Sequence, residues 1–174
     1  MEPRATPLPP TPLPSGITPG ELRDIGLFGA LGDDALQHLV SSLKILQRSA
    51  GEIIFGEGDA AREFYVILQG EVEVFKVLQR GTEARLATLT PGHWFGEMSV
   101  LDVQPRSASV RALVPCSLLV VTARDLDALY RRDLRSYTLV VLNVARELAR
   151  RLRVVDELVA DFVGNVRNQH IGYG

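Results

Sequence analysis

The sequence predicts a mainly β fold with flanking α-helices: an antiparallel β-roll or jelly roll, with N-terminal helices before it and a long C-terminal helix after it. Short runs rich in β-branched residues recur between Glu52 and Thr122, and glycine or proline separates the runs. Apolar residues follow a helical spacing before this region and again after it. Strands and helices do not alternate along the chain, which argues against a doubly wound nucleotide-binding fold.

The composition is that of a soluble globular protein. The chain has 174 residues, of which 46% are hydrophobic and 23% charged, about the length of one domain. Its net charge of −2 gives no general attraction to nucleic acid or to an anionic membrane. No apolar run approaches the ~18 residues of a membrane span. Cys116 is the only cysteine, which excludes an intramolecular disulfide. We therefore expect a cytoplasmic protein that contacts neither membrane nor nucleic acid.

The N-terminal part divides into a leader and a helical region. Residues 1–20 hold seven of the ten prolines and show no hydrophobic period, which predicts a disordered leader before a folded domain at 21–174. From Glu21 to about Ser49 the apolar spacing is helical. Either Asp33 or Asp34 is placed to cap a helix in this region. The side chains that this helix is expected to bury are Leu36, Leu39, Val40 and Leu43.

The β-roll is expected over about residues 51–122. Residues 71–77 alternate between polar and apolar side chains, which is typical of a strand with one face in water. Frequent glycine and proline breaks favour short antiparallel strands. The expected strands are 53–55, 64–68, 71–78, 85–89, 108–113 and 117–121.

The C-terminal helices are expected over about residues 123–164. A first segment, 123–130, precedes a long helix that starts near Asp133. Apolar positions on the long helix step by four and three residues without interruption, which is a heptad seam. Such a stripe either packs on the roll of its own chain or joins two chains, and its length favours a homodimer through this helix. The seam consists of Val141, Ala145, Leu148, Leu152, Val155, Val159, Phe162 and Val166.

The segment at 95–108 carries the candidate chemistry. Glu97 lies nine residues before Arg106, and a short helix is possible between them. A helix N-terminus offers free N–H groups to a phosphate, and an arginine can grip the same anion through two parallel hydrogen bonds. A carboxylate beside such a site accepts hydrogen bonds only, so a sugar hydroxyl is its natural partner. The residues alone also allow a surface ion pair that closes a loop.

The sequence FGEMSVLDVQPRSASV, residues 95–110, resembles the phosphate-binding cassette of the cyclic nucleotide-binding domain family. Residues 51–59 resemble the family's early β-turn motif, and residues 64–72 resemble its central hairpin. Leu27-Phe28, followed by Leu31, resembles the N-terminal helical entry. The motifs occur in the family's order, and the resemblance covers about residues 22–163.

The resemblance implies a β-roll and a ligand, cAMP or cGMP. It assigns Glu97 to the ribose 2′-hydroxyl and Arg106 to the phosphate. The family's sensor domains in bacterial catabolite-activator-type regulators bind such ligands without catalysis, so no enzyme activity, cofactor or metal is expected. The resemblance also assigns Ser107 and backbone groups of Gly96, Met98 and Ser99 to the cradle around the phosphate.

Two features depart from the family's pattern. The long helix carries Val155-Asp156 where the activators have a hydroxyl pair that meets adenine. Asp156 can accept a hydrogen bond from adenine's amine or from guanine's N–H edge, so it does not separate the two bases; between cAMP and cGMP we favour cAMP. The sequence also ends before a DNA-reading domain, so no nucleic-acid partner is expected. The leading hypothesis is a cyclic nucleotide sensor with an unknown downstream protein partner; the alternative is a ligand-free dimeric interaction scaffold.

Other chemistry-bearing residues favour structural roles. His38, His93 and His170 lack the paired spacing of metal ligands, and no nucleophile–base pair is visible. Trp94 could stack on a base, but a core role is favoured. Cys116 is expected to be a small buried hydrophobe. The arginines of the long helix are expected to form a solvated face: Arg131, Arg132, Arg135, Arg146, Arg150, Arg151 and Arg153.

Overall fold

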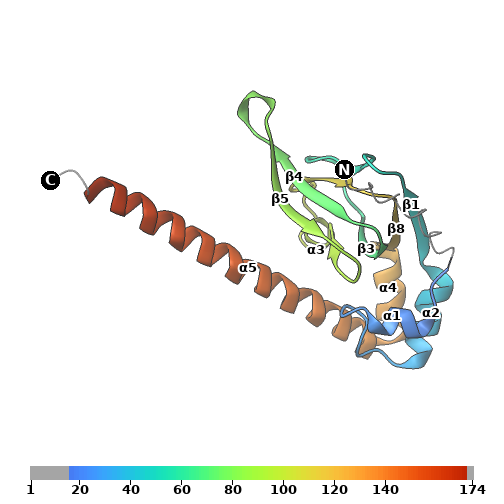
Figure 1. Cartoon of the computed structure of the whole chain (residues 1–174). Coiled ribbons are helices and arrows are strands. Elements are labelled where there is room, and N and C mark those ends of the chain that lie inside the picture. The colour runs from blue at the N-terminus through green and yellow to red at the C-terminus, as the bar shows by residue number, and fades with distance from the viewer. Residues whose placement is uncertain (1–15, 172–174) are drawn as a thin grey trace, which may run out of the picture.

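The computed structural model describes residues 16–171, with side chains to residue 164. The first fifteen residues of the expected leader lie outside the described residues, as do the side chains of Val166 and His170. Two antiparallel sheets of four strands form a β-roll, and helices from both ends of the chain gather at one side of it (Figure 1). The elements are α1 (Pro19–Asp24), α2 (Asp33–Ser42), β1 (Lys44–Arg48), β2 (Ile53–Phe55), β3 (Glu63–Gln69), β4 (Val72–Val77), η1 (Gln79–Gly81), β5 (Glu83–Leu89), β6 (Trp94–Phe95), α3 (Met98–Leu101), β7 (Ser109–Ala112), β8 (Cys116–Thr122), α4 (Ala123–Arg132) and α5 (Leu134–Ile171).

The predicted fold class is confirmed: the strands form two antiparallel sheets flanked by helices. One sheet has the order β1-β8-β3-β6 and the other has β2-β7-β4-β5. Every expected β run contains a strand, because each run is short, β-branched and bounded by turn residues. β6 is a two-residue strand whose Phe95 pairs with Tyr65 of β3, so it fixes the start of segment 95–108 against the roll.

Helix α1 begins inside the expected leader. Thr18 caps α1 and forms a capping box with Glu21, and proline at the first helical position, Pro19, is compatible with a helix start. The leader boundary at residue 20 is therefore wrong by two residues. The expected cap of α2 is also wrong: Gly32 is the N-cap, and Asp33 lies inside the first turn, where its charge favours the positive end of the helix.

Residues 44–48 form strand β1, although the apolar spacing predicted helix as far as Ser49. β1 pairs antiparallel with β8, from Lys44 opposite Val120 to Arg48 opposite Cys116. Five residues are too few for period 2 to be distinguished from period 3.6, so the free edge of β8 decides the conformation. Cys116 is fully buried, as expected.

Residues 71–77 were expected to form a strand with one solvent-exposed face, but that face is only partly exposed. Glu73 is 3% exposed because two arginines from neighbouring strands cover it. Arg85 Nε donates to one carboxylate oxygen at 2.6 Å, and Arg111 Nε donates to the other at 2.8 Å. Hydrogen bonds from both arginines, that of Arg111 above all, hold the pKa of Glu73 below its usual range. Glu73 thus completes an ionic cluster on the outer face of the sheet.

The hydrophobic core has two parts. Inside the roll, Ile67, Phe95 and Leu118 are buried between the two sheets. A second cluster joins the helices to the sheet that contains β1; Trp94 belongs to it, which confirms the core role expected for this residue. The side chains of this second cluster include Leu22, Phe28, Leu36, Phe64, Leu119, Leu129, Val140 and Val144. The first turns of α5 are therefore fixed to the roll.

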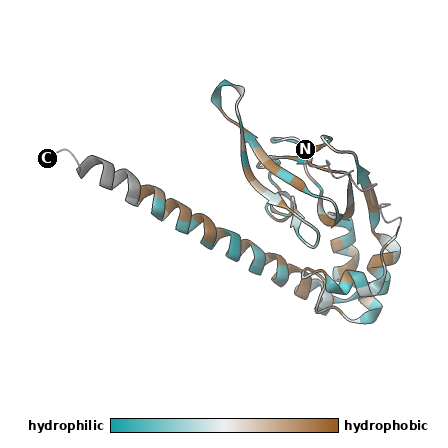
Figure 2. Cartoon of the chain, viewed as in Figure 1, coloured by the Kyte–Doolittle hydropathy of each residue, from teal (hydrophilic) through white to brown (hydrophobic). Residues whose placement is uncertain are grey.

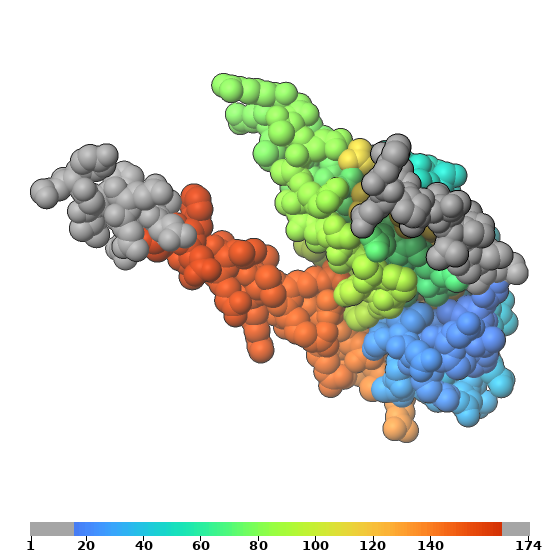
Figure 3. Space-filling model, viewed as in Figure 1, coloured from blue at the N-terminus to red at the C-terminus, as the bar shows by residue number. Residues whose placement is uncertain are grey.

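Among the described side chains, those of the outer half of α5, from Leu152 on, belong to neither core cluster. The helix extends to Ile171, beyond the expected end near residue 164. Figure 3 shows this half extending away from the roll, and Figure 2 shows hydrophobic residues continuing along it. Within one chain, the interpretation that the whole stripe packs on the roll is wrong. The seam residues there are 51–69% exposed: Leu152, Val155, Val159 and Phe162. Nowhere in residues 16–171 is a helix long and apolar enough to cross a membrane.

Candidate functional site

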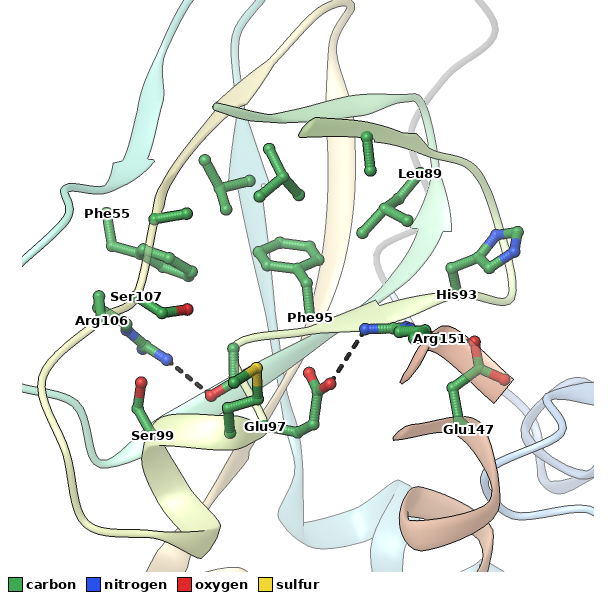
Figure 4. Close-up of a pocket in the computed structure, with 16 residues that line it drawn as sticks. Phe55, Leu89, His93, Phe95, Glu97, Ser99, Arg106, Ser107, Glu147 and Arg151 are labelled. Atoms are coloured by element: carbon green, nitrogen blue, oxygen red, sulfur yellow. Dashed lines mark hydrogen bonds and ion pairs between the residues drawn. The ribbon is translucent and has the colours of Figure 1, made fainter. Parts of the chain in front are cut away.

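A cavity of ≈330 Å³ lies between the interior of the roll, segment 95–108 and α5 (Figure 4). Its apolar wall comes from strands of both sheets and consists of Phe55, Val74, Ala87, Leu89, Phe95 and Val110. Its polar lining consists of His93, Glu97, Ser99, Arg106, Ser107, Glu147 and Arg151. The labelled polar residues run along one side of the cavity, from Arg106 to His93 (Figure 4), and a few polar groups in a largely apolar cavity are typical of a small-molecule site.

The turn at Gly96 brings segment 95–108 into the cavity. Gly96 has φ +85°, a conformation that favours glycine, and Glu97 follows as the N-cap of the single-turn helix α3. A Cβ on Gly96 would lie 2.6 Å from Arg106 Nη1, so a larger residue here would force the end of the arginine side chain to move. The short helix expected between Glu97 and Arg106 is thus confirmed.

Arg106 is held by backbone and side-chain contacts. Its carbonyl accepts from Gly58 N at 2.8 Å, and its own N–H donates to Asp59 O at 2.9 Å. The side chain is 2% exposed; Nη1 donates to Gly96 O at 2.9 Å, and Nη2 lies 3.5 Å from Glu63 Oε1. Its Nε is buried and has no hydrogen-bond partner among the described residues. Burial lowers the pKa of the guanidinium from its usual value.

Glu97 is the buried acid of the cavity. Its side chain is 2% exposed, and Oε1 accepts from Arg151 Nη1 at 3.0 Å. Oε2 is buried without a hydrogen-bond partner among the described residues. Burial raises the pKa of this carboxyl, and the charge of Arg151 opposes the rise.

Arg151 connects the cavity to the long helix. Besides Glu97, it donates through Nη2 to Trp94 O at 2.9 Å and through Nε to Glu147 Oε1 at 3.1 Å. The expectation that this arginine belongs to a solvated face is therefore wrong. The i,i+4 spacing of Glu147 and Arg151 was the available signal, but it indicates only a local pair, not a contact 54 residues away.

The structure brings most of the predicted site residues together. Gly96, Glu97, Met98, Ser99, Arg106 and Ser107 all line the cavity. Asp156 does not: it is exposed on α5 and lies outside the cavity lining. His93, which was expected to be structural, lines the cavity, and its Nδ1 lies 3.0 Å from Thr90 O.

Tyr65 and Glu63 lie behind Arg106. The Tyr65 hydroxyl donates to Glu63 Oε1 at 3.1 Å, the same oxygen that faces Arg106. Burial and the nearby Glu63 carboxylate raise the pKa of Tyr65 to about 12, so the phenol stays neutral and acts as a donor. Sequence reasoning missed both residues.

The described side chains hold no group of three or more histidine, cysteine, aspartate or glutamate residues that could bind a metal ion. The acids near the cavity are instead paired with arginines. Glu97 and Glu147 both contact Arg151. The arrangement is suited to an uncharged or anionic organic ligand with a hydroxyl group, not to a cation.

Comparisons with known proteins agree with this geometry. A family model described as cyclic nucleotide-binding domain matches residues 46–133. The cyclic AMP receptor protein of Thermus thermophilus is 38% identical over 130 residues, which cover 75% of this chain and 58% of that protein. The cAMP-dependent protein kinase regulatory subunit of Mycosarcoma maydis is 35% identical over 91 residues, 52% of this chain and 17% of that protein. The chain thus spans less than two thirds of either curated relative.

Two solved structures are similar over most of the chain. The Thermus thermophilus catabolite activator protein has a TM-score of 0.69 and 37% identity, and the match covers 80% of this chain and 63% of that one. A cyclic nucleotide-binding domain from Methylobacillus flagellatus has a TM-score of 0.75 and 26% identity, covering 82% of this chain and 83% of that one.

Proposed function

The chain belongs to the cyclic nucleotide-binding domain family, and on that premise we propose that it is a non-enzymatic regulatory module that binds cAMP in the cavity beside α3. The observation that carries the proposal is a pair of buried atoms without partners in the described part of the chain. Glu97 Oε2 is an acceptor and Arg106 Nε is a donor, and both residues line the same cavity. Buried polar atoms left unpaired are costly, so such a pair favours a ligand that supplies the missing partners.

The two unpaired atoms require different ligand groups. Glu97 as a carboxylate needs a hydroxyl or amine donor, and Arg106 needs an acceptor that is best anionic. A ribose 2′-hydroxyl and a cyclic phosphate supply these groups within one small ring system. The apolar wall then offers Val74, Leu89 and Val110 to the base. A cyclic nucleotide therefore matches the polar side and the apolar wall of the cavity together.

The route from ligand to output runs through Arg151. Glu97 Oε1 is bonded to Arg151 of α5, so a hydroxyl that binds Glu97 changes the surroundings of an ion pair between roll and helix. A ligand shifts a conformational equilibrium only by its different affinities for the two states. The Glu97–Arg151 contact depends on where α5 lies against the roll. We therefore expect the nucleotide to bind one position of α5 more tightly than another and so to favour that position.

The outer half of α5 supports a homodimer. Its seam residues from Leu152 to Phe162 have the heptad spacing of a two-stranded coil, and each side chain is more than half exposed in the single chain. Large apolar side chains repeated on one exposed face are typical of a surface that another chain covers. A downstream partner protein is the further component that a non-enzymatic sensor needs.

The choice of cAMP over cGMP rests on the relatives, two of which are named for cyclic AMP. Asp156 stays a candidate for base contact only in an arrangement that brings it to the ligand, for example from a second chain. His93 lies at the end of the cavity away from Arg106, where Arg151 and Glu147 also lie (Figure 4). A tenfold preference for cGMP would overturn the proposed ligand.

A thermal-shift screen tests the proposal directly. cAMP, cGMP, a cyclic dinucleotide, adenosine and inorganic phosphate are added separately to the full chain. A ligand at 100 times its dissociation constant adds about 2.7 kcal/mol to the free energy of unfolding, or roughly 5–10 °C for a chain of this size. We expect this shift with cAMP and little with adenosine, which lacks the phosphate. No shift with any cyclic nucleotide would favour the ligand-free scaffold.

A further inference from the structure

The guanidinium of Arg106 lies over an aromatic ring as well as beside hydrogen-bond acceptors. Its side chain is 2% exposed, yet it has one short hydrogen bond, to Gly96 O, and one long contact, to Glu63. Its Cζ lies 4.0 Å from the centroid of the Phe55 ring and 5.8 Å from that of Tyr65. A cation this close to a ring face is attracted by the ring's quadrupole, and more strongly where water is excluded.

We propose that Phe55 is a positioning residue of the anion site, because its ring face holds the Arg106 guanidinium in place before the ligand arrives. The inference rests on the proposed function and adds a residue to it. Arginine has several rotatable bonds, and fixing it in advance reduces the entropy lost when it grips a phosphate. Figure 4 shows Phe55 directly beside Arg106 on one wall of the cavity.

The Phe55 ring is itself fixed. Phe55 ends strand β2 and pairs with Val110 of β7. Its ring centroid lies 6.0 Å from that of Tyr65 and 5.8 Å from that of Phe95, and those two rings are 5.4 Å apart. Three rings in mutual contact have little freedom to rotate, so the outer ring presents a stable face to Arg106.

Gly96 closes the remaining space around the guanidinium. The position of a Cβ on Gly96 would be 2.6 Å from Arg106 Nη1 and 3.4 Å from a ring carbon of Phe55. Glycine, ring and guanidinium are therefore packed against one another, while Gly96 O fixes Nη1. The Phe55 ring on one side and the Gly96 backbone on the other thus orient the guanidinium before any ligand binds.

The first test compares matched cation–π pairs. Phe55→Leu removes the ring but keeps an apolar side chain. Phe75→Leu is the control, because Arg111 lies 4.7 Å over Phe75 outside the cavity. By calorimetry, Phe55→Leu should weaken cAMP binding about tenfold, whereas Phe75→Leu should leave it within twofold. Equal affinities of the two variants would overturn the proposal.

A second comparison separates positioning from direct contact with ligand. In the Arg106→Ala background, Phe55→Leu should cause no further loss of affinity, because the group on which the ring acts is absent. If Phe55→Leu still weakens cAMP binding tenfold in that background, the ring acts on the ligand itself and the positioning role is refuted.

A readout without nucleotide keeps the inference testable if no cyclic nucleotide binds. In proton–nitrogen NMR spectra, the Arg106 Nε–H signal, assigned by its loss in Arg106→Lys, should be shifted upfield by the Phe55 ring. The shift should vanish in Phe55→Leu and persist in Phe75→Leu. A normal Arg106 signal in the wild-type protein would refute the inference whatever the ligand; an upfield signal without nucleotide binding would refute only the proposed function.

Discussion

Replacing Arg151 by methionine tests the contact between α5 and the cavity. Arg151 donates to Glu97, whose side chain is 2% exposed, and methionine removes the charge while keeping much of the apolar stem. Removing one partner of a fully buried ion pair lowers the free energy of unfolding by about 3–5 kcal/mol. Since the Arg151 side chain is 33% exposed, water screens part of the interaction, and we expect a loss of about 2 kcal/mol near neutral pH.

Arg150→Met is the matched control for this change. Arg150 is the neighbouring residue and pairs with Glu147, as Arg151 does, but its side chain is 65% exposed. An exposed ion pair contributes roughly 0–1 kcal/mol, so the control should stay within about that range of the wild type. Urea denaturation followed by circular dichroism measures both variants at the same protein concentration.

The pH dependence follows from Glu97. Burial raises the pKa of Glu97 in the folded protein above its value in the unfolded chain. At pH values between these two pKa values, the folded protein binds more protons at Glu97 than the unfolded chain does. The stability that Glu97 contributes is therefore greatest below its unfolded pKa and decreases as pH rises from the unfolded to the folded pKa. A protonated Glu97 needs no counter-ion, so the deficit of Arg151→Met relative to Arg150→Met should shrink toward acidic pH. Equal stabilities near neutral pH, or a deficit that grows on acidification, would refute the reasoning.

Two other predictions concern the sugar and the dimer. Glu97→Gln should weaken cAMP binding by about 1–2 kcal/mol, since an amide oxygen still accepts, and 2′-deoxy-cAMP should bind equally poorly to wild type and variant in calorimetry. A deoxy analogue that binds as tightly as cAMP would remove the role given to Glu97. Replacing Leu152 and Val159, which are 60% and 55% exposed, by aspartate should yield monomers by analytical ultracentrifugation without loss of fold by circular dichroism. A wild type that is already monomeric at micromolar concentration, with and without nucleotide, would contradict the dimer.

The part of the site that could be predicted lies in one continuous segment. Glu97 and Arg106 are joined by a turn, a single-turn helix and a short loop, so their local sequence largely determines their relative placement. Arg151 and Asp156 could not be placed this way. Which face of α5 meets the cavity depends on how Val140 and Val144 seat the helix on the roll, and the heptad pattern alone leaves that rotation open.

The fold shows the same division between local and distant determinants. Strands bounded by glycine and proline were predictable because each carries its own turn signals. Strand β1 was not, because its conformation depends on pairing with β8, more than 60 residues away. The burial of Glu73 was likewise invisible in its own strand, since the covering arginines come from β5 and β7.

The central claim is that Arg106 binds the phosphate of a cyclic nucleotide in this cavity, and calorimetric titration of cAMP into the wild type and Arg106→Ala tests it most directly. We expect one site per chain in the wild type and a loss of about 2–4 kcal/mol in the variant, roughly 30- to 1,000-fold. Arg106→Lys should recover little of this affinity, because a point charge cannot replace the guanidinium fork. Affinity of Arg106→Ala within about threefold of the wild type, well under 1 kcal/mol, would contradict the claim.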